Sequence, residues 1–166
     1  MIIRKETPAD FESITNVTVE AFKSHPISRQ TEHFIIRALR AAEALTLSLV
    51  VEINGQIVGH IAFSPIEISD GTQEWFGLGP ISVLPEYQQK GIGTALINKG
   101  LSELKDLGAQ GCALVGMPEY YNRFGFKNFP QLIHEGIPQE VFLVLPFYDK
   151  VPKGTVTFHK AFNAES

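Results

Sequence analysis

Residues 78–96 read LGPISVLPEYQQKGIGTAL, and this stretch predicts a strand, a loop with two glycines and a helix, in that order. Pro85 has no backbone N–H and restricts Leu84 to extended conformations, so the strand is expected to end there. The first N–H groups of the helix have no internal partner and carry partial positive charge. Gly91 and Gly93 leave room for a ligand close to the backbone. The stretch therefore predicts a phosphate-binding site at the start of the helix.

The loop at residues 88–93 reads QQKGIG, which has the spacing Q-x-x-G-x-G. This spacing is not the P-loop pattern G-x-x-x-x-G-K-[ST]. It also differs from the dinucleotide motif G-x-G-x-x-G, which opens an N-terminal βαβ unit. A tight turn with close helix packing would use the same two glycines. The spacing alone therefore leaves both interpretations open.

The chain before this stretch predicts alternating helices and hairpins. The expected elements are a strand at 2–4, a helix that begins at Thr7 and Pro8, a second helix from near Ser28, and strands at 47–53, 56–68 and 74–83. Asn54-Gly55 is a strong signal for a hairpin between two of these strands. Pro65 indicates an edge position or a bulge, because proline cannot donate to a ladder.

The chain after this stretch predicts a crossover and further strands. The expected elements are a helix that ends at Gly108, a strand at 112–115, helical turns at 118–123, and strands from Phe124, Val141 and Thr155. A strand, a helix and a second strand imply a right-handed parallel crossover. We expect an α/β fold with a mixed, mostly antiparallel central sheet, one β-α-β crossover and flanking helices. The 166 residues are expected to form a single domain.

Composition excludes several function classes. A net charge of −4 without a Lys/Arg run argues against nucleic acid as a partner. Neither a signal-peptide core nor an apolar run of about 20 residues is visible, so we expect no membrane partner and a cytoplasmic location. Cys112 lies in an apolar run and is expected to be a buried thiol. The five histidines show no ligand spacing, so no metal site is expected.

A second motif makes the phosphate-site interpretation more specific. Residues 120–126 read YYNRFGF and follow the glycine loop by about one crossover. In this order the two motifs resemble the GNAT superfamily of acetyl-CoA-dependent N-acetyltransferases, whose members share a [RQ]-x-x-G-x-[GA] loop and a Y-x-x-x-G-F segment. The YYNRFGF run and residues 154–162, GTVTFHKAF, are similar to the bacterial YhbS-like subgroup of predicted acetyltransferases. The resemblance covers nearly the whole chain.

The resemblance implies a site for acetyl-CoA as co-substrate. Backbone groups of Ile81, Ser82 and Val83 would pair with the pantetheine arm as a neighbouring strand would. The loop and first helical turn would hold the pyrophosphate, with this set of residues: Gln88, Gln89, Lys90, Gly91, Ile92, Gly93 and Thr94. Many family members also contact CoA through an Asn before the Y-x-x-x-G-F helix. This chain has Met117-Pro118 there, so that contact is either missing or made by Asn122.

The resemblance also implies an acid for the leaving group. Tyr121 matches the position from which many family members protonate the departing thiolate, and a tyrosine with a pKa near 10 can donate that proton. The other interpretation of Tyr121 is aromatic core beside Phe124 and Phe126. Tyr120 is the weaker candidate, because on a short helix it would point elsewhere.

The acceptor amine must lose a proton as well. Glu74, at the start of a strand, is the expected catalytic base. His60 is an alternative, and Glu119 is less favoured because it lies beside the short helix. A chain of water molecules with no dedicated base fits equally well.

These features predict an enzyme that transfers an acetyl group from acetyl-CoA to a primary amine by direct attack in a ternary complex. The alternative is a non-catalytic acyl-CoA sensor or partner-binding module, and Tyr121 favours the enzyme. The resemblance places the acceptor between residues 22–29 and 131–140, which are mixed in character. We therefore expect the acceptor to be a small-molecule or peptide amine of unknown identity. We also expect the protein to be a monomer or homodimer.

Overall fold

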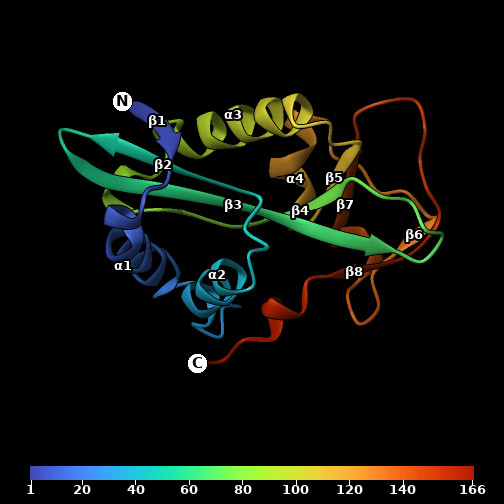
Figure 1. The fold of residues 1–166 in the computed structure, drawn as a ribbon, viewed down its shortest axis with the longest axis horizontal. Helices are drawn as coiled ribbons and strands as arrows, with labels where there is room; N and C mark the ends of the chain where they lie inside the picture. Colours follow the sequence, from blue (N-terminus) through green and yellow to red (C-terminus); the bar gives the residue numbers. More distant parts are fainter.

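The structure is a computed structural model that describes residues 1–166. One mixed sheet, flanked by helices, contains all eight strands (Figure 1). The helices are α1 (Phe11–Phe22), α2 (Glu32–Ala41), α3 (Ile92–Asp106) and α4 (Pro118–Tyr121). The strands are β1 (Ile2–Lys5), β2 (Leu47–Ile53), β3 (Gln56–Ile68), β4 (Trp75–Val83), β5 (Gly111–Val115), β6 (Leu132–Ile133), β7 (Phe142–Pro146) and β8 (Gly154–Phe158).

The sheet has the strand order β1-β2-β3-β4-β5-β7. Beyond the end of β2, the long strand β3 pairs with β8, which in turn pairs with β6. Only β4–β5 and β6–β8 are parallel, and the remaining pairs are antiparallel. The expected mixed, mostly antiparallel sheet with one β4-α3-β5 crossover is confirmed.

The helices form two layers on opposite faces of the sheet. Figure 1 shows α3 above β2 and β3, with α1 and α2 below. Two glycines permit the close approach of α3. A Cβ on Gly59 of β3 would lie 3.3 Å from Leu96, and one on Gly100 of α3 would overlap the ring of Phe63. The buried residues between these layers form the main core.

Strands β4 and β5 separate soon after they meet. They pair only over Trp75–Gly77 and Gly111–Ala113. Beyond Gly77, β4 continues along β3 alone and contains a bulge, because Leu78 faces Phe63 while Ile81 faces Ile61. Gly79 within this bulge has a φ of +138°, which favours glycine. One edge of β4 is therefore open from residue 78 to residue 83.

Three local expectations differ from the structure or become more specific. The second helix begins at Glu32 and not near Ser28, because Gln30 has a left-handed φ of +63° and bonds the Ser28 hydroxyl. No strand begins at Phe124, where a short 3-10 helix ends at left-handed Gly125. Pro65 has a strand partner only on its β4 side, in the gap between β2 and β8, which confirms the edge position.

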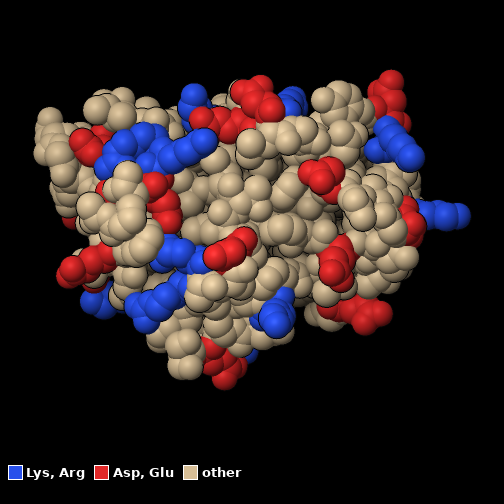
Figure 2. Space-filling view, viewed as in Figure 1, with Lys and Arg blue, Asp and Glu red and all other residues tan.

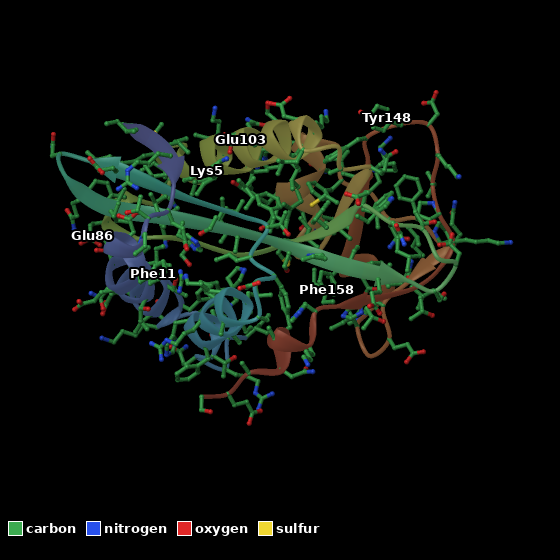
Figure 3. All side chains as sticks on the ribbon, in the orientation of Figure 1. Lys5, Phe11, Glu86, Glu103, Tyr148 and Phe158 are labelled. Carbon is green, nitrogen blue, oxygen red and sulfur yellow. The ribbon has the colours of Figure 1, made fainter.

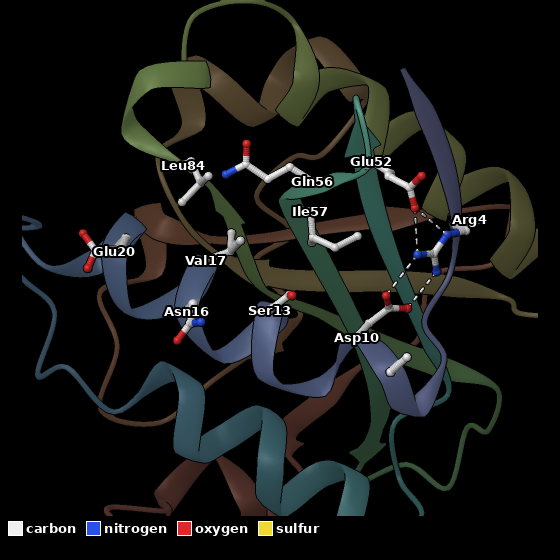
Figure 4. Close-up of a pocket in the computed structure, with 12 residues that line it drawn as sticks. Arg4, Asp10, Ser13, Asn16, Val17, Glu20, Glu52, Gln56, Ile57 and Leu84 are labelled. Atoms are coloured by element: carbon white, nitrogen blue, oxygen red, sulfur yellow. Dashed lines mark hydrogen bonds and ion pairs between the residues drawn. The ribbon is translucent and has the colours of Figure 1, made fainter.

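An ion-pair cluster fastens β1 to the sheet and to the start of α1. The Arg4 guanidinium lies 2.7 Å from Asp10 and 3.0 Å from Glu52 (Figure 4). The hydrogen bond from Arg4 lowers the pKa of Asp10 from 3.8 to about 2, and the Thr7 N–H also donates to this carboxylate. Because the folded-state pKa of Asp10 is depressed, the contribution of this ion pair to the free energy of unfolding is complete above about pH 4. It is lost as the pH falls toward 2.

We expect Arg4→Met to lower the free energy of unfolding by about 2 kcal/mol at pH 7, since one pKa unit corresponds to ~1.4 kcal/mol. The deficit should shrink between pH 4 and pH 2 in urea denaturation. The matched control is Arg29→Met, whose ion pair with Glu165 is exposed on both sides and should contribute less than about 0.5 kcal/mol. Equal losses in the two variants would contradict the role of Arg4.

Candidate active site

The loop after β4 is shaped by its own backbone and by one side chain. Gln88 donates from its side-chain amide to the carbonyl of Val83, 2.9 Å away, which folds the loop back onto the strand end. Gln89 and Gly91 both have left-handed φ angles, +62° and +84°. Between them lies the exposed Lys90, whose ammonium is 5.8 Å from the ring of Tyr87. The loop thus begins α3 with its backbone exposed.

The N–H groups of residues 89–94, six in a row, donate to no loop or cap carbonyl and to no side chain. The first N–H of this region that is bonded in the helical manner belongs to Ala95, which donates to the Gly91 carbonyl. Consecutive free N–H groups at a helix N-terminus bind anions, because their dipoles and the helix dipole add. The residues that the sequence predicts to bind pyrophosphate therefore include a run of consecutive free N–H groups of this kind.

The open edge of β4 leads into this loop. Ile81, Ser82 and Val83 pair with β3 on one side and with no strand on the other. Ser82 is buried, and its hydroxyl has no partner. A strand edge with unpaired N–H and C=O groups can accept an extended chain that carries amides. The strand edge and the glycine loop thus form a track of backbone donors and acceptors, interrupted between them where Leu84, Tyr87 and Gln88 use their N–H groups within the protein.

The two tyrosines of α4 point to different places. The Tyr120 hydroxyl lies 3.4 Å from the Thr94 hydroxyl, in the first turn of α3, and Arg123 stacks on its ring. The Tyr121 ring instead packs against Gly116, where an added Cβ would collide with it, and 6.1 Å from Phe126. Tyr120, for which the sequence predicts another direction, is thus the one beside the glycine loop.

Tyr121 is half-buried, and its hydroxyl makes no hydrogen bond within the protein. Burial, and to a smaller extent Tyr120, raises the pKa of Tyr121 to about 12. The phenol is consequently protonated at neutral pH. A protonated hydroxyl without an internal partner is free to donate to a bound ligand.

The structure does not bring Glu74 together with Tyr121. Glu74 lies on the β3–β4 turn with a φ of +65°, and its carbonyl accepts the N–H of Gln110, just before β5. Tyr121 packs at Gly116, just after β5 ends. Six residues of strand at about 3.3 Å each separate these points by roughly 20 Å.

His60 is fully buried in a polar chain on the α1–α2 face. Its Nε2–H donates to Ser48 at 2.7 Å, Ser48 donates to Glu6 at 2.6 Å, and Glu6 pairs with Arg40. Burial lowers the pKa of His60 to about 4, so the ring is neutral. Its Nδ1 has no partner, and the ring has no exposed surface. This environment favours a structural role.

The two remaining candidates are exposed. Asn122 lines a shallow hollow with Lys127 and Leu143, and no contact joins it to the glycine loop. Glu119 lies in the first turn of α4 and makes no ion pair. Cys112 is completely buried, as the sequence predicts, and burial raises its thiol pKa.

A cavity of about 410 Å³ opens where β4 and β5 separate. Its walls include Gly79 and Pro80 from the β4 bulge and Val115 from the end of β5. The acceptor is expected at residues 22–29 and 131–140, and Phe22 and His134 from these segments line this cavity. The C-terminal wall, residues 157–163, was missed, because only long-range pairing of β8 with β3 brings it here.

The other surfaces of the protein offer fewer groups that could bind a ligand or take part in a reaction. A polar cavity of about 470 Å³ beside α1 contains the Arg4–Asp10–Glu52 cluster, in which the one guanidinium is already paired with both carboxylates (Figure 4). Acidic and basic side chains lie side by side over β1, and the middle of that face is largely uncharged (Figure 2). No group of three or more His, Cys, Asp or Glu residues could hold a metal ion. None of the helices has both the length and the apolar character that a membrane crossing requires.

Comparison with known proteins gives the family. The sequence profile of the acetyltransferase (GNAT) family matches residues 11–126, which contain the glycine loop and the YYNRFGF run. The chain belongs to the GNAT acetyltransferase family. The chain is also 33% identical over 128 residues to the uncharacterized N-acetyltransferase YhbS of Escherichia coli K12, which covers 76% of this chain and 74% of YhbS.

Two solved structures share the whole acetyltransferase fold. A GNAT family acetyltransferase from Brucella melitensis, solved with acetyl-CoA, is 48% identical with a TM-score of 0.87 over 97% of both chains. Escherichia coli YhbS, solved with CoA, is 29% identical with a TM-score of 0.89 over 99% of this chain and 93% of its own. The resemblance stated from the two motifs, including the YhbS-like subgroup, is confirmed.

Proposed function

We propose that this protein is an N-acetyltransferase that takes the acetyl group from acetyl-CoA and transfers it to a primary amine. The observation that carries the proposal is the track made by the open β4 edge and the six free N–H groups of residues 89–94. The acetyl-CoA complex of the 48% identical Brucella protein supports the same co-substrate. Glu74 is not part of the proposal, because it lies at the other end of β4.

The residues present fit two parts of acetyl-CoA, the pyrophosphate and the pantetheine arm. The free N–H groups of residues 89–94, with Lys90 beside them, offset the roughly two negative charges of a pyrophosphate. The edge of β4 from Ile81 to Val83 offers partners to the two amides of the pantetheine arm. Tyr120 and Thr94 close the far side of the loop, so the track leads along β4 toward α4.

The transfer step is a direct displacement. The neutral amine nitrogen attacks the thioester carbonyl, a C–N bond forms, and the C–S bond breaks. The nitrogen gives up a proton to a base or to water, and Tyr121 donates its hydroxyl proton to the leaving sulfur. Burial that raises the pKa of Tyr121 also raises that of a thiol held beside it, so proton transfer between them remains feasible.

Calorimetric titration and steady-state kinetics test the proposal. We expect acetyl-CoA to bind at a single site and to release CoA thiol when a suitable amine is present. Initial-rate plots should intersect, because both substrates must be bound at once. Failure of acetyl-CoA, CoA and longer acyl-CoAs to bind would overturn the proposal. Binding without thiol release across a broad range of amines would instead indicate an acyl-CoA sensor.

A further inference from the structure

The cavity at the β4–β5 separation has a chemistry that selects among amines. It is lined by Leu78, Gly79 and Pro80, which belong to the same open stretch of β4 that the proposed function assigns to acetyl-CoA. The ring of Phe158 lies over Gly77, the last β4 residue that pairs with β5, and a Cβ there would be 2.7 Å from that ring. Figure 3 shows Phe158 between the sheet and the C-terminal segment. A group held against Phe158 therefore lies at the point where the two strands diverge.

The body of the cavity is apolar and aromatic. Phe22 comes from the end of α1, Ile35 from α2, and Phe158 and Phe162 from the C-terminal segment. The rings of Phe158 and Phe162 are 5.4 Å apart, and Phe158 meets the ring of His134 edge-on at 4.9 Å. Such walls gain free energy by burying apolar surface, and aromatic faces also attract cations.

Glu32 is the one wall residue with a carboxylate, and it suits a positive charge. Glu32 lines the cavity and has no Lys or Arg partner; its only donor is the Ser28 hydroxyl, at 2.7–2.8 Å from its two oxygens. Glu32 lies in the first turn of α2. His134 donates from Nδ1 to the Val156 carbonyl, and its Nε2 has no partner in the protein. No Lys or Arg lines the cavity.

We propose that this cavity binds the acceptor, and that the acceptor is an amine on an apolar or aromatic body that carries no anionic group. The proposal rests on the acetyltransferase function proposed above. The Glu32 carboxylate attracts the ammonium form of the amine, and the aromatic walls hold its body. A substrate carboxylate or phosphate would meet Glu32 and would find no cation to offset it. Amino acids and phosphorylated amines are therefore poor acceptors.

Matched pairs of amines test this selection in the full-length protein. Acetyl-CoA binding is measured first by calorimetry, and CoA thiol release is then followed with phenethylamine against phenylalanine and with hexylamine against 6-aminohexanoate. We expect the kcat/KM of each amine without a carboxylate to exceed that of its carboxylated partner by about 100-fold. The reason is the repulsion between the substrate carboxylate and Glu32, two like charges a few ångströms apart at a protein surface. Mass spectrometry of the acetylated amine confirms the product.

The variant Glu32→Gln separates charge from shape. It should raise the KM of phenethylamine about 10-fold, shrink the discrimination against phenylalanine, and leave kcat and acetyl-CoA affinity unchanged. The matched control is Glu12→Gln, since Glu12 also lies in the first turn of its helix, α1, but is exposed and lies outside the cavity. Glu12→Gln should change none of these quantities.

The outcomes distinguish the two proposals. Loss of all acyl-CoA binding would overturn the acetyltransferase proposal itself. If acetyl-CoA binds but carboxylated amines or a lysine peptide react faster, or if no amine in the set reacts, the proposed acceptor class is overturned and the acetyltransferase proposal is not. Equal effects of Glu32→Gln and Glu12→Gln would also overturn the proposed acceptor class.

Discussion

Substitution of Gly91 by Asp is expected to abolish acetyl-CoA binding. Gly91 precedes the first turn of α3 in the middle of the six free N–H groups, and nothing lies within 4 Å of the position of an added Cβ. A carboxylate there would face the pyrophosphate at about 4 Å. One such pair of charges costs about 4 kcal/mol at an effective dielectric constant of 20, so affinity should fall by about a thousand-fold.

Two further variants separate the charge from backbone strain. Gly91 has a φ of +84°, which any other residue adopts at a cost of about 1 kcal/mol. Gly91→Ala introduces that strain without charge and should weaken binding much less. Gly71→Asp introduces both strain and charge at a turn with a φ of +86° and equally open space, outside the loop. Calorimetry should show normal acetyl-CoA binding for Gly71→Asp, and normal binding for Gly91→Asp would contradict the phosphate site.

Loss of the Tyr121 hydroxyl is expected to slow acetyl transfer by about 100- to 1,000-fold, the range typical of a positioned general acid. The Tyr121→Phe variant should bind acetyl-CoA normally and unfold at nearly the same temperature, because the hydroxyl has no partner in the protein and the ring packing is retained. Single-turnover rates, measured with both substrates saturating, isolate the chemical step from binding.

Tyr120→Phe provides the comparison for Tyr121→Phe. It removes the hydroxyl that lies 3.4 Å from Thr94, beside the phosphate loop. A few-fold rise in the KM of acetyl-CoA is expected, with kcat unchanged within a factor of about three. If Tyr120→Phe instead abolishes turnover and Tyr121→Phe does not, the general acid has been assigned to the wrong tyrosine.

The pH profile gives a second check on Tyr121. An acid catalyst loses activity only as it deprotonates, and the pKa of Tyr121 is raised to about 12. Deprotonation of Tyr121 should therefore not lower the kcat of the wild-type enzyme below about pH 11. Any fall of kcat at a lower pH should persist in Tyr121→Phe. A falling limb near pH 9 that disappears in this variant would show that Tyr121 is a stronger acid than its burial implies.

Local sequence patterns predicted most of the fold correctly. Asn54-Gly55 turns the β2–β3 hairpin, and Pro85 follows the end of β4. Each of these signals acts within a few residues, through allowed backbone angles and missing N–H groups, so the sequence alone is sufficient. The failures near Ser28 and Phe124 are local too, but they depend on left-handed angles at Gln30 and Gly125 that compete with the expected helix and strand.

The residues of the site divide in the same way. The sequence by itself determined the donor side, because the glycine loop and the end of β4 are one continuous segment whose free N–H groups follow from its own turn. Only the tertiary structure decided that Glu74 lies far from Tyr121 and that Tyr120 is the tyrosine beside Thr94. It also brought Phe22 and Phe158 together in the cavity proposed for the acceptor. Strand pairing between distant segments sets those positions, and no local pattern encodes the register of β8 on β3.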